Sequence, residues 1–293
     1  MWACAKVFDL TLVLALASAA PALAEAPGRV VSINLCTDQL AMMLAAPGQL
    51  VSVSDLASEP QSSSMVRQAA GYAVNHGQAE EVFLMHPDLV LAGSYTALAT
   101  VDMLRRLGIP VVQVPPANSL AEAVEQVRIV GAALGQEERA EWFATRFETS
   151  IRAARIAGPR YSAAFYHPNG YTTGSGTLAD EVMGLTGFDN IAATAGVTGG
   201  GVLPLERLVM AAPEVLVTSE PYPGASRAEE VLTHPALRAV QDNAGATLHT
   251  DADWVCGTPL IMRAINGMRR AHIRLDCKDP GNWNSKMCRL DAQ

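Results

Sequence analysis

The stretch Glu80-Glu-Val-Phe-Leu-Met-His-Pro87-Asp88-Leu-Val-Leu is matched later in the chain by Glu206-Arg-Leu-Val-Met-Ala-Ala-Pro213-Glu214-Val-Leu-Val. Each begins with a glutamate, continues as a mostly apolar run of helical character, and reaches a proline followed by an acid and an aliphatic run. Proline has no N–H and pushes the residue before it out of helical geometry, so the helix must end there. The aliphatic run is typical of a buried parallel strand. A helix–proline–strand unit that occurs twice predicts two similar α/β lobes, each presenting a glutamate from an equivalent place.

The bulk composition fits this interpretation. A chain of 293 residues exceeds one average domain and can form two lobes of ordinary size. Its 49% hydrophobic and 17% charged residues predict a well-buried core and argue against disorder. The net charge of −8 offers no electrostatic footprint for nucleic acid, so we expect no nucleic-acid partner.

The first 24 residues resemble an export signal. Lys6 supplies a positive charge, the stretch from Leu10 to Ala20 is apolar, and Ala22-Leu23-Ala24 is a small-x-small cleavage site. Cys4 precedes the apolar stretch, where it is badly placed for lipid attachment. We therefore expect residues 1–24 to be a cleaved signal peptide and the mature protein to be soluble and exported. A retained N-terminal anchor is the alternative.

Export implies an oxidising compartment, in which an even number of cysteines favours disulfides. Four cysteines follow the predicted signal peptide, and they allow three pairings: Cys36, Cys256, Cys277 and Cys288. Cys277 and Cys288 bracket a polar tail. A bridge between them would close a short loop and contribute about 2–3 kcal/mol by the loop-entropy model.

Segments typical of strands and helices alternate along the mature sequence, which predicts a mainly parallel sheet covered on both faces. The predicted strands lie near residues 29–34, 50–54, 89–92, 109–114, 161–166, 215–217 and 246–250. The last helix is expected to run from about Pro259 to Ile273, because proline suits the first turn of a helix.

The two halves are expected to be joined by helix. Pro115-Pro116 ends the first βα pattern, and Ser119-Leu-Ala-Glu122 is a capping box. From there to about Ala157 nearly every residue is compatible with helix, with Gly131 and Gly135 as break points. We therefore predict an N-terminal lobe over 25–117, a single long interlobe helix within 118–157, a C-terminal lobe over 158–275 and a tail over 276–293.

The chain resembles the periplasmic solute-binding proteins of cobalamin and iron–siderophore importers, the class III periplasmic binding proteins. The resemblance rests on the order of its pieces: an opening Arg29-Val-Val-Ser strand, the Glu80 unit, Arg105-Arg-Leu-Gly-Ile-Pro110 and Asp253-Trp254-Val-Cys-Gly-Thr-Pro259. It implies two Rossmann-like lobes with mainly parallel sheets, joined by one long helix, which hold a ligand in the cleft between them. It also implies an ABC importer permease as partner, a periplasmic location and no enzymatic activity.

The resemblance gives the repeated glutamates a role. In the family, one surface glutamate of each lobe docks against arginines of the permease, and Glu80 and Glu206 occupy the matching positions. Exposed charges at the rim of an interface act mainly on orientation and association rate. The simpler interpretation is that both are first-turn glutamates that stabilise helix N-termini by about 0.3–1 kcal/mol each.

Ligands of open parallel α/β sheets bind beyond the carboxyl ends of the strands. Aromatic side chains with polar tips suit a broad ligand, and they recur in those loops here. The residues expected to line the cleft, His76 by resemblance alone, are Cys36, His76, Tyr95, Tyr171, Tyr222, Asp253, Trp254 and Cys256. Tyr171 and Tyr222 could instead simply pack their loops.

Cys36 and Cys256 lie, by resemblance, on opposite lobes near the cleft. They could form a disulfide across it, line it as free thiols, or coordinate a metal or a metal-bearing ligand as soft donors. A disulfide requires Cα atoms within about 7 Å, which the sequence does not establish.

We predict a monomeric protein without cofactor that captures a metal chelate, with a corrinoid such as cobalamin ranked first and a ferric siderophore or haem next. A direct transition-metal site built from His76, His167 and Asp253 is an alternative, although their spacing lacks a compact ligand motif. An exported α/β hydrolase is a weaker alternative, because Gly174-Ser175-Gly176 lacks the spacing of a nucleophile elbow. A scaffold protein that uses its lobes only for protein contacts is a third class.

Overall fold

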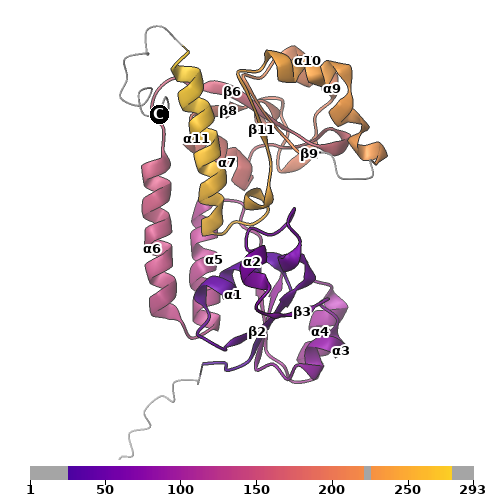
Figure 1. The fold of residues 1–293 in the computed structure, drawn as a ribbon, viewed down its shortest axis with the longest axis vertical. Helices are drawn as coiled ribbons and strands as arrows, with labels where there is room; N and C mark the ends of the chain where they lie inside the picture. Colours follow the sequence, from indigo (N-terminus) through magenta and orange to yellow (C-terminus); the bar gives the residue numbers. More distant parts are fainter. Residues whose placement is uncertain (1–25, 221–225, 279–293) are drawn as a thin grey trace, which may run out of the picture.

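The computed structural model describes residues 26–220 and 226–278, which form two α/β lobes with three long helices along one side (Figure 1). The N-terminal lobe has a parallel sheet in the order β3-β2-β1-β4-β5. Its strands are β1 (Val30–Ser32), β2 (Leu50–Ser54), β3 (Ala73–Asn75), β4 (Leu89–Gly93) and β5 (Val111–Val114).

Helices cover both faces of this sheet. Val31 and Val90 face one side, where they pack with Val82 of α3 and Leu104 of α4. Val30 and Leu91 face the other, in the main core with α1 and α5. The shorter elements of this lobe are α1 (Leu35–Leu44), η1 (Asp55–Ser58), α2 (Val66–Ala69), α3 (Ala79–Leu84) and α4 (Leu98–Arg106).

The C-terminal lobe repeats the arrangement with a parallel sheet in the order β11-β10-β6-β8. Its strands are β6 (Tyr161–Tyr166), β8 (Phe188–Asn190), β10 (Val215–Thr218) and β11 (Ala246–His249), and a separate antiparallel pair joins β7 (Tyr171–Thr173) to β9 (Gly200–Val202). Its helices and 3-10 turns are η2 (Pro168–Gly170), α7 (Leu178–Leu185), α8 (Ile191–Thr194), α9 (Leu205–Ala211), η3 (Arg227–Thr233), α10 (Pro235–Asn243), η4 (Ala252–Trp254), η5 (Pro259–Ile261) and α11 (Met262–Asp276). The fold class, two lobes with mainly parallel sheets, is confirmed.

The duplicated sequence unit forms the same structure in both lobes. Helix α3 leads into β4 and helix α9 leads into β10, and the residues before the two prolines, His86 and Ala212, have φ values of 50° and 42°. The acid after each proline then holds the start of the neighbouring strand. Asp88 accepts hydrogen bonds from the amides of Gly28 and Arg29 at 2.9 and 2.8 Å.

Glu214 has the same role in the other lobe. Its carboxylate accepts from the amide and the hydroxyl of Ser162 at 2.7 and 3.0 Å, at the beginning of β6. The proline therefore ends the helix, and the acid fixes where the adjacent central strand begins. This is the physical reason for the repeat that the sequence shows.

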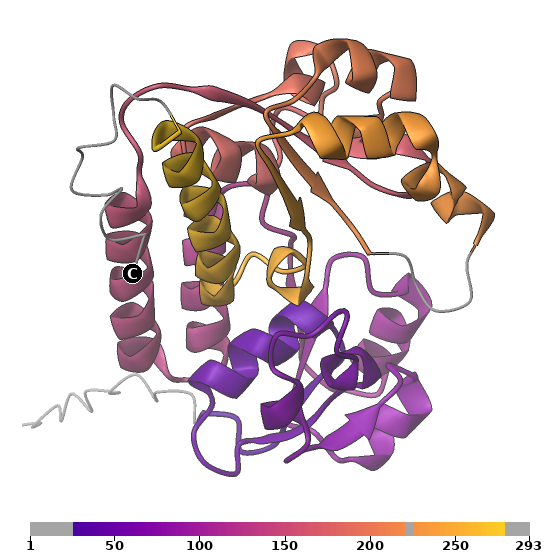
Figure 2. The ribbon, with the colours of Figure 1, turned by 45° about the horizontal axis from the view of Figure 1, so that its top comes forward.

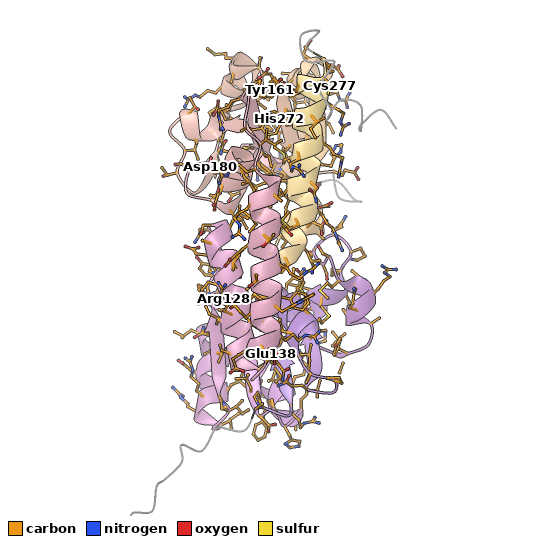
Figure 3. All side chains as sticks on the ribbon, turned by 90° about the vertical axis from the view of Figure 1, so that its left-hand side faces the viewer. Arg128, Glu138, Tyr161, Asp180, His272 and Cys277 are labelled. Carbon is orange, nitrogen blue, oxygen red and sulfur yellow. A yellow bond between two sulfur atoms is a disulfide. The ribbon has the colours of Figure 1, made fainter. Side chains whose placement is uncertain are left out.

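The connector differs from the expected single long helix. It consists of α5 (Leu120–Ala133) and α6 (Glu137–Ala154), which lie side by side and run in opposite directions (Figures 1 and 3). Gly135, with φ of 65°, makes the turn between them, because glycine adopts this left-handed conformation without steric cost. Helix α6, about 27 Å long at about 1.5 Å per residue, is the part that reaches from one lobe to the other.

Charge pairing and close backbone packing hold the two connector helices together. Arg128 of α5 contacts Glu141 and Glu148 of α6 at 2.8 and 2.9 Å. Gly131 faces α6 so closely that a Cβ there would lie 2.1 Å from the Cβ of Ala140. The N-terminus of α5 is capped by Ser119, which accepts from the amide of Glu122 at 3.1 Å. The Glu122 carboxylate bonds the amide of Asn118 at 2.7 Å, one residue before the amide that a capping box would use.

None of the helices described in residues 26–220 and 226–278 has the length and apolarity that a membrane span requires.

Asp38 is a buried carboxyl on α1. Ser54 donates to it through both its amide and its hydroxyl, while the second carboxylate oxygen has no partner among the described residues. Burial is the main cause that raises the pKa of Asp38 to about 7.

The close contact at Gly131 gives a first prediction. Gly131→Ala should destabilise the protein by about 1–3 kcal/mol, because the added methyl group must push α5 and α6 apart. Gly184→Ala, within α7 where no atom lies within 4 Å of the added Cβ, should be neutral or stabilise by up to about 1 kcal/mol. Urea unfolding of the two variants measures both effects. Equal changes in the free energy of unfolding of the two variants would contradict the close packing of Gly131 against α6.

Asp38 gives a prediction for pH. The folded state holds this proton up to a pH of about 7, whereas an unfolded Asp releases it near pH 4. Stability should therefore fall as pH rises from about 4 to about 7 and then level off. In Asp38→Asn this contribution disappears, so the variant should gain stability relative to the original protein across that window, by at most about 4 kcal/mol. Unfolding at several pH values tests this, and a stability difference that stays constant with pH would refute it.

Candidate ligand-binding cleft

Two adjacent cavities lie between the lobes, at the carboxyl ends of the parallel strands. The C-terminal compartment has a volume of about 620 Å³, and the N-terminal compartment has a volume of about 380 Å³. Both are lined by Thr173, Ala179, Trp254 and Val255, so these residues form a wall common to the two. The position agrees with the rule that open parallel sheets bind ligands beyond the carboxyl ends of their strands.

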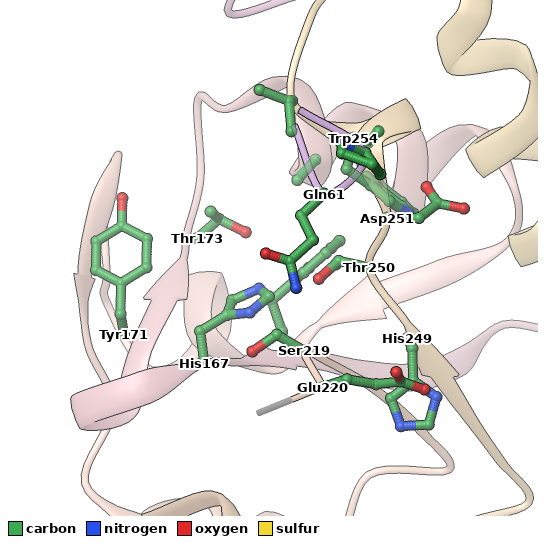
Figure 4. A pocket seen from close by; sticks show the side chains of 15 residues that line it. Gln61, His167, Tyr171, Thr173, Ser219, Glu220, His249, Thr250, Asp251 and Trp254 are labelled. Atoms are coloured by element: carbon green, nitrogen blue, oxygen red, sulfur yellow. The ribbon is translucent and has the colours of Figure 1, made fainter. Parts of the chain in front are cut away.

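The C-terminal compartment is built from the residues that directly follow β6, β10 and β11 (Figure 4). His167 follows β6, Ser219 and Glu220 follow β10, and Thr250 and Asp251 follow β11. Tyr171 of β7 lies at the left of the close-up, across the cavity from Asp251 (Figure 4). Gln61 comes from the N-terminal lobe and also lines this compartment.

An aromatic stack forms the floor of this compartment. The imidazole of His167 stacks on Phe165 with ring centroids 5.8 Å apart, and Trp254 meets the same ring edge-on at 4.9 Å. Burial lowers the pKa of His167, so the ring is uncharged at neutral pH. Flat apolar faces and a neutral imidazole therefore meet at one point of the cavity.

Apart from imidazoles, the charged side chains in the described lining of both compartments are the carboxylates of Glu220 and Asp251. Loss of hydration raises the pKa of Asp251, and the hydrogen bond that it accepts from the amide of Asp253 at 3.0 Å opposes this rise. Asp251 remains exposed, and its partial loss of hydration disfavours a second anion beside it.

The N-terminal compartment is bounded by the loops after β1, β4 and β5. Its lining includes Asn34, Tyr95, Pro115 and Pro116. Tyr95 is 88% exposed, so its ring is available to a ligand. Asn34 caps α1 by accepting from the amide of Cys36 at 3.1 Å, which orients the start of that helix toward the cavity.

The structure assigns Cys36 and Cys256 to a disulfide, with Cα atoms 5.3 Å apart. Of the three arrangements that the sequence allowed, the bridge across the cleft is the one present. Cys36 lines the N-terminal compartment and Cys256 is buried behind it. By the loop-entropy model, a bridge between residues 220 positions apart contributes about 5 kcal/mol to stability.

The other predicted cleft residues divide into two groups. Tyr95, Tyr171 and Trp254 line the cavities. His76 and Asp253 do not: His76 is exposed and pairs with Glu81 at 3.2 Å, and Asp253 accepts from Ser64 at 2.6 Å and pairs with Arg263 at 3.2 Å.

Two predictions extend beyond the described residues. Tyr222 lies outside them, so its place in the cleft stays a prediction. Cys277 is disulfide-bonded, and Cys288, its predicted partner, also lies outside them.

His76, His167 and Asp253 do not form the alternative metal site. Only His167 lines a cavity, and residues 26–220 and 226–278 contain no group of three or more metal-ligating side chains. In the structure His76 pairs with Glu81 and Asp253 pairs with Arg263.

Sequence reasoning missed several lining residues, among them Gln61, Ser219, Glu220, His249, Thr250 and Asp251. Four of them are the first residues after β10 and β11, so the rule that selected the aromatic residues could have found them too. Gln61 has no such signal, because it comes from a loop of the opposite lobe.

The repeated glutamates occupy equivalent places on the surface. Each is the second residue of its helix, is exposed, and forms no hydrogen bond or ion pair with another described residue: Glu80 on α3 and Glu206 on α9. Four residues later each helix exposes a large apolar side chain, Leu84 at 72% and Met210 at 85%. The repeat thus presents a carboxylate beside an apolar side chain on both lobes.

Comparison with known proteins identifies the class. A family model described as "Periplasmic binding protein" matches residues 30–252, and the chain belongs to this family. Among curated proteins it is 28% identical over 203 residues to the vitamin B12-binding protein of Yersinia pseudotuberculosis, covering 67% of this chain and 71% of that protein. It is 26% identical over 206 residues to YvrC, an uncharacterized ABC transporter substrate-binding lipoprotein of Bacillus subtilis, covering 66% of this chain and 64% of that protein's length.

Solved structures share the fold. The periplasmic heme-binding protein RhuT of Roseiflexus sp. RS-1 aligns with a TM-score of 0.68 and 23% identity, over 83% of this chain and 97% of that one. The vitamin B12-binding protein BtuF of Vibrio cholerae aligns with a TM-score of 0.65 and 20% identity, over 85% and 98%. The relatives are solute-binding proteins rather than enzymes, and at these identities the structures support the fold alone.

Proposed function

We propose that this protein is an exported, soluble, periplasmic component of an ABC importer that captures a metal-chelate ligand and delivers it to the membrane permease. The observation that carries the proposal is the cleft itself, a pair of joined cavities at the carboxyl ends of two parallel sheets with Trp254, Tyr171 and Tyr95 in its walls. The protein acts as a monomer, without cofactor, and binds its ligand without changing it chemically.

A corrinoid is the leading ligand, with a ferric siderophore or haem next. The relative named vitamin B12-binding protein supports this order. So do the carboxylates of Glu220 and Asp251, because the rim of a corrinoid carries amides whereas haem carries two propionates that they would repel. The neutral His167 and the amide of Gln61 add hydrogen-bonding groups that suit an amide-bearing rim.

The ligand assignment is tested by titrating the protein with cyanocobalamin and with haem, followed by calorimetry. We expect cyanocobalamin to bind more tightly. Trp254→Ala should weaken that binding about tenfold or more, because it removes an aromatic face from both compartments. Trp142→Ala is the matched control, since Trp142 is 55% exposed on α6 and lines neither cavity.

Tighter binding of haem would reverse the ranking, and binding of neither chelate would count against the metal-chelate proposal. The visible spectrum of the protein purified from its native periplasm provides an independent check, because corrinoid, haem and ferric siderophore absorb differently.

We propose further that Glu80 and Glu206 dock the protein on the permease. Both carboxylates are free of partners among the described residues, and each occupies the same helix position in its lobe. The apolar side chains of Leu84 and Met210 beside them give each docking point an area that gains from burial. Capping of the helix N-termini is compatible with this role.

The docking proposal predicts that Glu80→Ala combined with Glu206→Ala leaves ligand affinity unchanged and abolishes transport. The matched control is Glu137→Ala combined with Glu138→Ala, which removes the same charge from exposed first-turn positions of α6. Uptake of labelled ligand by cells that carry each variant measures the effect. Normal uptake in the Glu80→Ala, Glu206→Ala variant, or an equal loss of uptake in both double variants, would contradict the docking proposal.

A further inference from the structure

The segment Thr250–Thr258, here called the strap, crosses from the C-terminal lobe to the N-terminal lobe. It leaves β11, forms η4 and continues through η5 into α11, which returns along the side of the molecule (Figures 1 and 2). The strap carries Trp254 and Val255, two of the four residues in the wall common to both compartments. The shape of the cleft therefore depends on where the strap is held.

Three contacts fix the strap to the N-terminal lobe. The Cys36–Cys256 disulfide joins it covalently to α1. Asp253 accepts a hydrogen bond from the hydroxyl of Ser64 at 2.6 Å, and the hydroxyl of Thr258 donates to the side-chain carbonyl oxygen of Gln39 at 3.1 Å. The two polar contacts lie on either side of the bridge in sequence.

Other contacts tie the strap to the C-terminal lobe. The amide of Thr250 bonds the carbonyl of Thr218 at 2.7 Å, and Trp254 packs edge-on against Phe165. Gly257 is wedged between the lobes, because a Cβ there would lie 2.6 Å from the side chain of Ala117 and 3.3 Å from that of Leu178. The strap is thus a second connection between the lobes besides α6, and the disulfide is its covalent anchor.

We propose that the Cys36–Cys256 disulfide is a positioning element of ligand recognition, which holds the Trp254–Val255 wall against the N-terminal lobe before ligand arrives. A wall that is already fixed loses less conformational entropy when the ligand binds. The affinity for the ligand is therefore higher, although no new contact is made. The proposal rests on the proposed ligand-binding function. It differs from a purely stabilising role, which would leave the local mobility of the wall and its ligand affinity unchanged under conditions where the protein stays folded.

The test compares Cys36→Ser with Cys256→Ser, made together, against the original protein at a temperature well below unfolding. Hydrogen exchange measured without ligand should become faster in residues 250–258 by more than it does in β1, β4, β6 and β10, because exchange in the core strands reports only the loss of global stability. Cyanocobalamin should bind about tenfold or more weakly. The matched control, Cys277→Ser with Cys288→Ser, should change neither quantity.

A second measurement keeps the test decisive if the double variant does not fold. The original protein is treated with a dithiol reductant, and loss of each bridge is followed by mass spectrometry of alkylated peptides. Saturating cyanocobalamin should slow reduction of the Cys36 bridge, because Cys36 lines the cavity, and should not affect the bridge of Cys277.

Exchange in residues 250–258 that rises no more than in β1, β4, β6 and β10 once the bridge is removed or reduced would overturn the proposal. So would unchanged cyanocobalamin affinity in a folded variant whose parent binds this ligand. If the original protein binds no chelate, the proposed function fails instead, while the exchange experiment still reports whether the bridge holds the wall.

Discussion

Each lobe is organised around one carboxylate that holds the beginning of a central strand. Asp88 accepts from two amides at the start of β1, and Glu214 accepts from the amide and the hydroxyl of Ser162 at the start of β6. The proline before each acid ends a helix, so helix end and strand start are set within a few residues. Because the strands are parallel, a fixed start also fixes the edge at which the following loops emerge. The cleft lies at that edge in both lobes.

The cleft depends on a second constraint that is not repeated between the lobes. The strap passes from one lobe to the other and is covalently joined to α1 by the Cys36–Cys256 bridge. It brings Trp254 to a place where the ring contacts Phe165 of β6 and also borders the compartment under Tyr95. The two sheets supply the loops, and the strap contacts both lobes beside them.

Apart from imidazoles, the charged side chains in the described lining of the cleft are carboxylates. A carboxylate on a partly dehydrated wall, such as Asp251, raises the cost of bringing another anion beside it. The half-buried, uncharged His167 adds no compensating positive charge. The carboxylates of Glu80 and Glu206, by contrast, lie exposed on the surface of the two lobes.

Local sequence determined the duplicated helix–proline–strand units, the parallel sheets and the place of the cleft, because proline chemistry and apolar runs act over a few neighbouring residues. The sequence also predicted a break in the helix at Gly135. It did not predict that the chain reverses there, because the antiparallel packing of α5 on α6 depends on the close approach of Gly131 to Ala140. Only the tertiary structure decided the pairing of Cys36 with Cys256, which are 220 residues apart. It likewise placed Gln61 in the cleft and His76 outside it. Those outcomes follow from how the lobes meet, which no local pattern encodes.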